Sequence, residues 1–156
     1  AEIILLDYGR NEMNKKICFV SNLCLLLWFF LDMVGLSINS HILVTRSYRD
    51  DGVFFLVFFA LFIWYVFKDK VGKYFLTGWL FMWFLIQFLS HWYFTIFGPS
   101  QGKINYFADT IKLIPSSTIY IPDLYHIILH VLILVSLINM IIYCITSTKS
   151  KIEKQI

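Results

Sequence analysis

Four apolar segments dominate the pattern of hydrophobic and polar positions along the chain. They cover residues 17–38, 53–67, 75–97 and 124–145. At about 1.5 Å of rise per residue, three of them can cross a hydrocarbon core of about 30 Å, whereas the second is short for a bilayer. Short polar turns and longer polar loops alternate between them. The pattern predicts an all-α integral membrane protein, a single domain over 1–156 built as an antiparallel bundle of four transmembrane helices.

The longest polar loop follows the third segment, after the breaker pair Gly98-Pro99. Ile104, Phe107, Ile111 and Ile114 recur in it at helical spacing. This spacing predicts a short amphipathic helix lying in the membrane interface before the fourth transmembrane helix. The helix that follows is expected to begin with Asp123 as its N-cap, because an aspartate side chain can accept a free backbone N–H there.

The other connections and the second helix carry simpler expectations. Residues 39–52 are interpreted as a solvated loop that includes Asp50 and Asp51. The helix over 53–67 has no polar side chain in its centre and is expected to face lipid over most of its surface. Tyr120 and Tyr125 are interpreted as residues of the aromatic belt at the membrane interface.

The composition agrees with a membrane location. Hydrophobic residues make up 59 % of the chain, aromatic residues 19 %, and the mean hydropathy is +0.72. A soluble domain of 156 residues has too much surface for its volume to bury so much apolar area. The net charge of +3 comes from basic residues scattered at the ends of apolar segments, which does not favour nucleic acid. The expected partners are the lipid bilayer and either a small ligand or a larger membrane complex.

Basic residues divide unequally between the two sides of the predicted bundle. Eight lysines flank one side and four basic residues lie in the loops of the other. The first set is Lys15, Lys16, Lys68, Lys70, Lys73, Lys149, Lys151 and Lys154, and the second is Arg46, Arg49, Lys103 and Lys112. Cytoplasmic loops carry the excess of Lys and Arg, so both termini are predicted to be cytoplasmic, in a plasma-membrane protein. The Met13-Asn14-Lys15-Lys16 pattern is typical of a natural start, which makes residues 1–12 an expected extension.

Ionisable residues within the apolar segments are the strongest functional signal. Asp32, His91 and His130 each lie about six residues from the outer end of a different predicted helix, at a common depth of about 9 Å. One helical turn separates His126 from His130, and one turn separates Gln87 from His91. An ionisable group in hydrocarbon is too costly to leave without a partner. The five side chains are therefore predicted to converge on one site in the outer half of the bundle.

These residue types fit more than one chemistry. Imidazole and carboxylate groups in a low dielectric can bind a ligand or relay protons, and this favours a transport-related membrane subunit as the function. The alternative is a membrane-embedded metal-dependent enzyme in which His91, His126, His130 and Asp32 hold zinc around a bound water. Haem b held between His91 and a histidine of the fourth helix is a weaker option. A structural or assembly factor, with the polar groups serving only helix packing, remains a third class.

Overall fold

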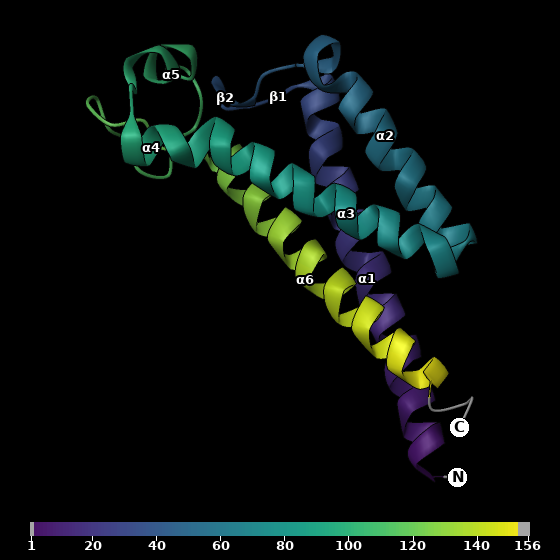
Figure 1. Cartoon of the computed structure of the whole chain (residues 1–156). Coiled ribbons are helices and arrows are strands. Elements are labelled where there is room, and N and C mark those ends of the chain that lie inside the picture. The colour runs from purple at the N-terminus through teal and green to yellow at the C-terminus, as the bar shows by residue number, and fades with distance from the viewer. Residues whose placement is uncertain (1, 153–156) are drawn as a thin grey trace.

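The computed structural model describes residues 2–152, which form a largely helical bundle (Figure 1). Four helical stretches in it are long and apolar enough to cross a membrane. They cover Gly9–Val34, Tyr48–Phe67, Asp69–Phe97 and Leu124–Thr148. The prediction of an all-α fold with four candidate transmembrane helices is confirmed.

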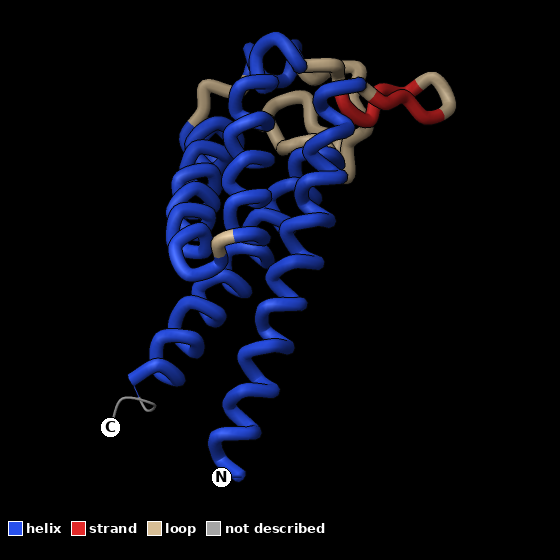
Figure 2. The backbone as a smooth tube through the Cα atoms, turned by 90° about the vertical axis from the view of Figure 1, so that its right-hand side faces the viewer, coloured by secondary structure: helices blue, strands red, loops and turns tan. Residues whose placement is uncertain are grey.

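The helices and strands follow one another in a simple antiparallel order. They are α1 (Glu2–Val34), β1 (Leu36–Ile38), β2 (His41–Val44), α2 (Tyr48–Phe67), α3 (Asp69–Gln87), the π-helix η1 (Phe88–Trp92), α4 (Tyr93–Phe97), α5 (Gln101–Tyr106) and α6 (Leu124–Ile152). The helices α1 and α6 pack along each other, and α2 and α3 form a helical hairpin that turns at Lys68. The start of α1 and the end of α6 lie at one end of the bundle, and β1, β2 and α5 lie at the opposite end (Figures 1 and 2). These are called the terminal end and the hairpin end below.

The first helix ends earlier than the apolar pattern predicts. It stops at Val34, because Gly35 has a φ of +74° that no helix contains. Asn39 and Ser40 then take φ angles of 48° and 70°. Two successive residues at positive φ match a tight two-residue hairpin turn, and they join β1 to β2. The prediction of helix through residue 38 is wrong, since the alternating apolar and polar sequence Leu36-Ser37-Ile38 after a glycine fits a strand equally well.

The second helix begins at Tyr48 rather than at residue 53, and it is not purely lipid-facing. Asp50 and Asp51 occupy its first turn, where carboxylates interact favourably with the helix dipole. Phe58 is fully buried, and its ring lies 5.2 Å from the ring of Trp83 in α3. Gly72 of α3 allows the close approach of the two helices, because a Cβ atom there would lie 2.6 Å from the Cα of Tyr65.

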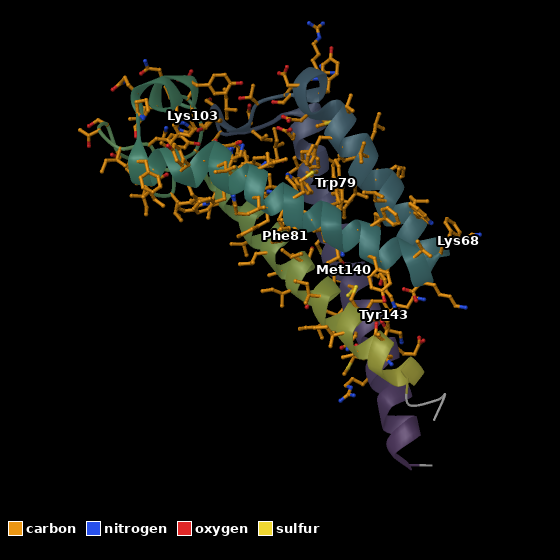
Figure 3. The ribbon with its side chains drawn as sticks, viewed as in Figure 1. Lys68, Trp79, Phe81, Lys103, Met140 and Tyr143 are labelled. Carbon is orange, nitrogen blue, oxygen red and sulfur yellow. The ribbon has the colours of Figure 1, made fainter. Side chains whose placement is uncertain are left out.

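Residues on the outer surface of the bundle remain apolar, as expected of a surface in lipid. Phe81 of α3 is 54 % exposed, whereas Trp79 packs against Phe54 of α2 with ring centroids 4.5 Å apart (Figure 3). Leu56, on the exposed face of α2, is 63 % exposed. The second helix thus has one packed face and one exposed face.

The loop before α6 contains a short helix, but not where the apolar spacing predicts it. That helix is α5, which ends at Tyr106, and the remaining residues to Asp123 are irregular. Ile42 of β2 accepts a backbone hydrogen bond from Ile111 at 2.9 Å, which ties the loop to the hairpin. The N-cap prediction is confirmed, because Asp123 Oδ1 accepts the backbone N–H of His126 at 3.0 Å.

Candidate functional site

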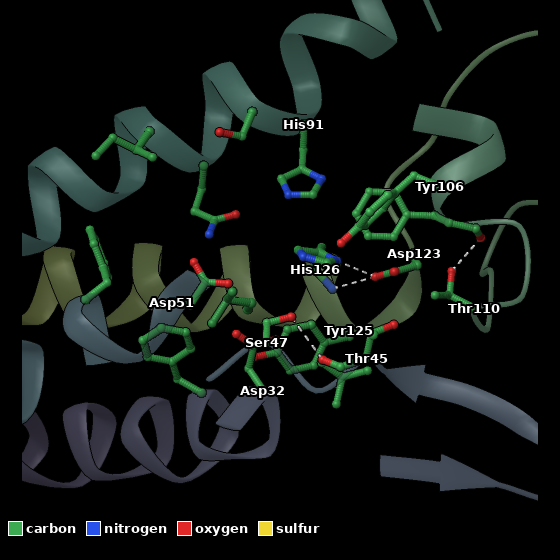
Figure 4. A pocket seen from close by; sticks show the side chains of 18 of the residues that line it. Asp32, Thr45, Ser47, Asp51, His91, Tyr106, Thr110, Asp123, Tyr125 and His126 are labelled. Carbon is green, nitrogen blue, oxygen red and sulfur yellow. Dashed lines mark hydrogen bonds and ion pairs between the residues drawn. The ribbon is translucent and has the colours of Figure 1, made fainter. Parts of the chain in front are cut away.

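A polar cavity of about 250 Å³ lies at the hairpin end (Figure 4). Its walls come from the end of α1, the start of α2, the segment around η1, the loop after α5 and the first turns of α6. Four of the residues predicted from the sequence line it, namely Asp32, Gln87, His91 and His126. The cavity thus joins side chains from three helices that are far apart in the sequence.

One wall of the cavity carries two carboxyl groups. Asp32 sits in the last turns of α1 and is 7 % exposed, and its carboxyl group lies within hydrogen-bonding reach of that of Asp51. The backbone N–H of Ser47 donates to the carbonyl oxygen of Asp32 at 2.8 Å. This bond fastens the end of α1 to the residue just before α2, so the aspartates meet where the two helices converge.

Asp51 was interpreted as part of a solvated loop; it is exposed, but it lies in the first turn of α2 and lines the cavity. The sequence did contain a signal for its position. An acidic pair directly before a long apolar run is typical of a first helical turn, and Asp51 stands there in α2. Only the packing of α2 against α1 turns that position towards Asp32.

The opposite wall carries two stacked imidazoles. The ring centroids of His91 and His126 are 4.1 Å apart, with 33° between the ring planes. His126 Nδ1 lies 2.7 Å from Asp123 Oδ1, and His91 Nδ1 shares a hydrogen bond of 2.6 Å with the hydroxyl of Tyr120. Burial raises the pKa of Tyr120, so its phenol stays neutral at physiological pH. Each histidine is therefore held at Nδ1 by one fixed partner.

His91 is directed into the cavity by a local irregularity of its helix. It lies in η1, the π-helical segment that follows α3. A π-bulge inserts a residue into a turn and so rotates the side chains that follow it, a feature common at functional sites. Figure 4 shows the His91 ring hanging from this segment towards His126. Nothing in the amino-acid pattern distinguishes this turn from an ordinary α-helical one.

His130, predicted to converge with His91, lies beside it but does not line the cavity. Its ring lies behind His91, with centroids 6.1 Å apart, and next to Phe84 and Trp92. The Nδ1 atom of His130 lies 3.0 Å from the carbonyl oxygen of His126 and must donate to it. The i, i+4 spacing did bring both histidines to one side of α6. However, the backbone bond turns the ring of His130 away from the cavity.

Several polar atoms on the cavity wall have no hydrogen-bond partner among the described residues. Tyr125 is 1 % exposed, and its buried hydroxyl is unpartnered, as is the buried Oε1 of Gln87. A buried polar atom without a partner costs about 1–3 kcal/mol. Such atoms are satisfied when water or a ligand fills the cavity.

Lys103 of α5 also lines the cavity (Figure 3 shows its position). Its ammonium group lies over the rings of Phe94 and Phe107, at 5.2 and 5.9 Å from their centroids. Burial lowers the pKa of Lys103, because the charged form loses part of its hydration. The sequence indicates Lys103 only as one of the basic residues that set the membrane orientation, since its contact with the cavity depends on the fold of the loop.

The arrangement gives no geometric support to a metal centre. Within residues 9–148, no group of three or more His, Cys, Asp and Glu side chains is placed so that it could hold a metal ion. The zinc and haem hypotheses stay predictions.

Comparison of the chain with protein-family models, with curated proteins and with solved structures finds no match. The geometry of the cavity is therefore the basis for inferring a function.

Proposed function

We propose that the protein is a small membrane subunit that binds a small polar ligand in the hairpin-end cavity, as part of transport or of ligand sensing. The observation that carries this proposal is the set of unpartnered polar atoms around a preformed space. Tyr125 and Gln87 each present one such atom to a cavity that also contains the buried Asp32. Ionisable residues inside a membrane protein are usually retained for such a task.

The proposal includes an orientation. In the sequence, eight lysines flank the apolar segments on the side of the terminal end, whereas four basic residues lie in the loops on the side of the hairpin end. The positive-inside rule then supports a plasma-membrane protein with cytoplasmic termini and a cavity that opens outside the cell. In a cysteine-free background, a cysteine replacing Ser117 should be labelled in intact cells, and one replacing Lys70 only after permeabilisation. The reverse pattern would invert the orientation.

Binding itself is tested by stabilisation, because a ligand that binds only the folded state raises the unfolding temperature. Purified protein is screened in detergent with small ammonium, carboxylate and polyol compounds. A compound that binds in the cavity should stabilise the wild-type protein but have little effect on Gln87→Leu. The matched control is Gln101→Leu, because Gln101 is exposed and bonds only to Asn105 within α5. If every compound acts equally on wild type and Gln87→Leu, the cavity is not the binding site.

Metal analysis of the same preparation tests the alternative enzyme class. Stoichiometric zinc that is lost in His91→Ala would favour a metal-dependent enzyme over ligand binding. A preparation without bound metal leaves the ligand-binding proposal as the leading one.

A further inference from the structure

The charge balance of the cavity indicates which class of ligand it takes. Asp32 and Asp51 bring two carboxyl groups together, and no Lys or Arg side chain among residues 9–148 approaches either within 4.0 Å. The nearest basic residues in sequence are engaged elsewhere, since Arg46 and Arg49 both stack on the ring of Tyr48. A carboxyl pair in a partly dehydrated site is stabilised by a cation. No lysine or arginine among residues 9–148 supplies that cation.

The unpartnered atoms around this pair add hydrogen-bond acceptors. The Oε1 atom of Gln87 can only accept, and the hydroxyl of Tyr125 has two lone pairs. The ring of Tyr125 is fixed by stacking on Trp28, with centroids 5.6 Å apart and 15° between the planes. It therefore cannot swing away to find another partner without losing this contact. The wall thus holds two further groups that can accept a hydrogen bond beside the carboxyl pair.

We infer that the ligand carries a small ammonium group, which donates to the carboxyl groups of Asp32 and Asp51 and to the free acceptors of Tyr125 and Gln87. This inference rests on the proposed function, because it names the chemical class of the ligand for the same cavity. An ammonium group is the cation whose several N–H donors match a carboxyl pair flanked by further acceptors.

The size of the cavity limits the rest of the ligand. A volume of about 250 Å³ corresponds to on the order of eight water molecules at about 30 Å³ each. It is below the usual range of about 300–1,000 Å³ for sites that bind drug-sized molecules. The ligand is therefore a compact amine, either free in solution or as the headgroup of an aminophospholipid.

The opposite side of the cavity argues against an anionic ligand. On that side, the ammonium group of Lys103 lies over aromatic rings, and His126 already faces the carboxylate of Asp123. An anion would have to approach three aspartates to reach these groups. An ammonium ligand instead meets hydrogen-bond acceptors on the side of Asp32.

The test uses three probes of equal size and different charge. Ethanolamine, ethylene glycol and glycolate are titrated into the full-length protein in detergent, and binding is measured by isothermal titration calorimetry. Ethanolamine should bind at least about tenfold more tightly than the other two, because only its ammonium group pairs with the carboxyl groups of Asp32 and Asp51. Preferential binding of ethylene glycol or glycolate would overturn the ammonium inference while the proposed ligand-binding function stands. Absence of binding by all three, together with no stabilising compound in the wider screen, would overturn both.

Variants locate the binding. Asp32→Asn and Asp51→Asn should each weaken ethanolamine binding by at least about tenfold. Asp50→Asn is the matched control, because Asp50 lies in the same helical turn and is exposed like Asp51, but does not line the cavity. It should leave the affinity within about twofold, since a charge outside the cavity acts on the ligand only through solvent, which screens it. If Asp32→Asn fails to fold, Asp51→Asn on the exposed helix start still tests the inference, and equal effects of Asp50→Asn and Asp51→Asn would contradict it.

Nanodiscs distinguish the two sources of the amine. Ethanolamine is titrated into protein in discs of phosphatidylglycerol alone and in discs that also contain phosphatidylethanolamine. A lipid headgroup that occupies the cavity competes with ethanolamine. The apparent affinity for ethanolamine should therefore fall at least about tenfold in the mixed discs, because the headgroup is present there at a local concentration far above its own dissociation constant. An unchanged affinity assigns the site to a free amine. Either result supports the ammonium inference only if Asp51→Asn removes ethanolamine binding in the phosphatidylglycerol discs, and retained binding there overturns it.

Discussion

Both ends of the bundle contain buried polar groups, but these groups are mostly hydrogen-bonded to one another at the terminal end and partly unpartnered at the hairpin end. At the terminal end, Lys73 is 2 % exposed and donates to the hydroxyl of Ser147 at 2.6 Å. The hydroxyl of Tyr143 donates to Asp69 at 2.7 Å, and Lys15 lies 3.7 Å from the same carboxylate oxygen (Figure 3 shows Tyr143). Apart from the second carboxylate oxygen of Asp69, the side-chain groups of this network have partners. They join α1, α3 and α6 directly.

At the hairpin end, the polar groups surround a space instead of filling it. Tyr125 and Gln87 present unpartnered atoms to the cavity, and Asp32 faces Asp51 without a cation. A polar residue within a membrane helix therefore does not by itself indicate function. Paired groups such as Tyr143 and Asp69 hold helices together, whereas unpaired groups around a cavity have capacity left for a ligand.

The largest expected effect concerns the helix that contributes to both ends. Phe58→Ala should lower the free energy of unfolding by about 3–5 kcal/mol, because it leaves a void against Trp83 between α2 and α3. Leu56→Ala, on the exposed face of α2, should change it by only about 0.5 kcal/mol. SDS-induced unfolding in mixed micelles measures both. Equal losses would mean that α2 is held by the surrounding lipid or detergent rather than by the bundle.

The next effect tests whether the terminal-end network is structural. Tyr143→Phe removes a buried hydrogen bond to a carboxylate and should cost about 1.5–3 kcal/mol of unfolding free energy. Tyr74→Phe removes an exposed bond to Thr148 at the same end and should cost about 0.5 kcal/mol or less. The same unfolding assay separates them. A loss of ethanolamine binding in Tyr143→Phe with unchanged stability would place function at the terminal end instead.

A smaller effect is expected from Lys103, the one lysine on the cavity wall as the structure describes it. Lys103→Gln should raise the affinity for ethanolamine about two- to fivefold, since repulsion between two partly solvated cations is worth about 1 kcal/mol or less. Lys112→Gln, in the same loop but outside the cavity lining, should leave the affinity unchanged. Calorimetric titration at low ionic strength measures the difference. A weaker affinity in Lys103→Gln would show that Lys103 binds an anionic part of the ligand.

The smallest effect on stability is the most informative for the comparison of the two ends. Tyr125→Phe removes a hydroxyl without a protein partner and keeps the ring that stacks on Trp28. The free energy of unfolding should be unchanged or raised by up to about 1 kcal/mol, the opposite sign to Tyr143→Phe. Thermal unfolding without ligand measures it. Destabilisation comparable to that of Tyr143→Phe would mean that the Tyr125 hydroxyl has a structural partner, such as an ordered water.

Depth counting along the predicted helices identified part of the site. It selected Asp32 and His91, and one-turn spacing added Gln87 and His126; all four line the cavity. The depth of Asp32 itself was overestimated, because α1 ends at Val34 rather than at residue 38. Depth counting also selected His130, which does not line the cavity, because the depth of a residue along a helix does not specify the direction in which its ring points. Asp51 was missed because the apolar run begins two residues later, and the counting started from that run.

Tyr125 and Lys73 show the limit of residue type as a signal. Tyrosine near a helix end is typical of the membrane interface, and lysine at a turn is typical of a cytoplasmic flank. Both residues are nearly fully buried here, one beside a cavity and one in a hydrogen-bonded network. Burial depends on which helices pack against those positions, and no pattern within a single helix contains that information.

The sequence by itself determined the four apolar helices, the N-cap at Asp123 and the level at which polar side chains gather. These features depend on local hydropathy and on the geometry of one helix. Only the tertiary structure decided that Asp32 meets Asp51, that η1 turns His91 into a cavity, and that Tyr125 is left without a partner. Each of these depends on distances between helices. Such distances are set by side-chain packing, such as that of Phe58 and Gly72 between α2 and α3, and not by the periodicity of either helix.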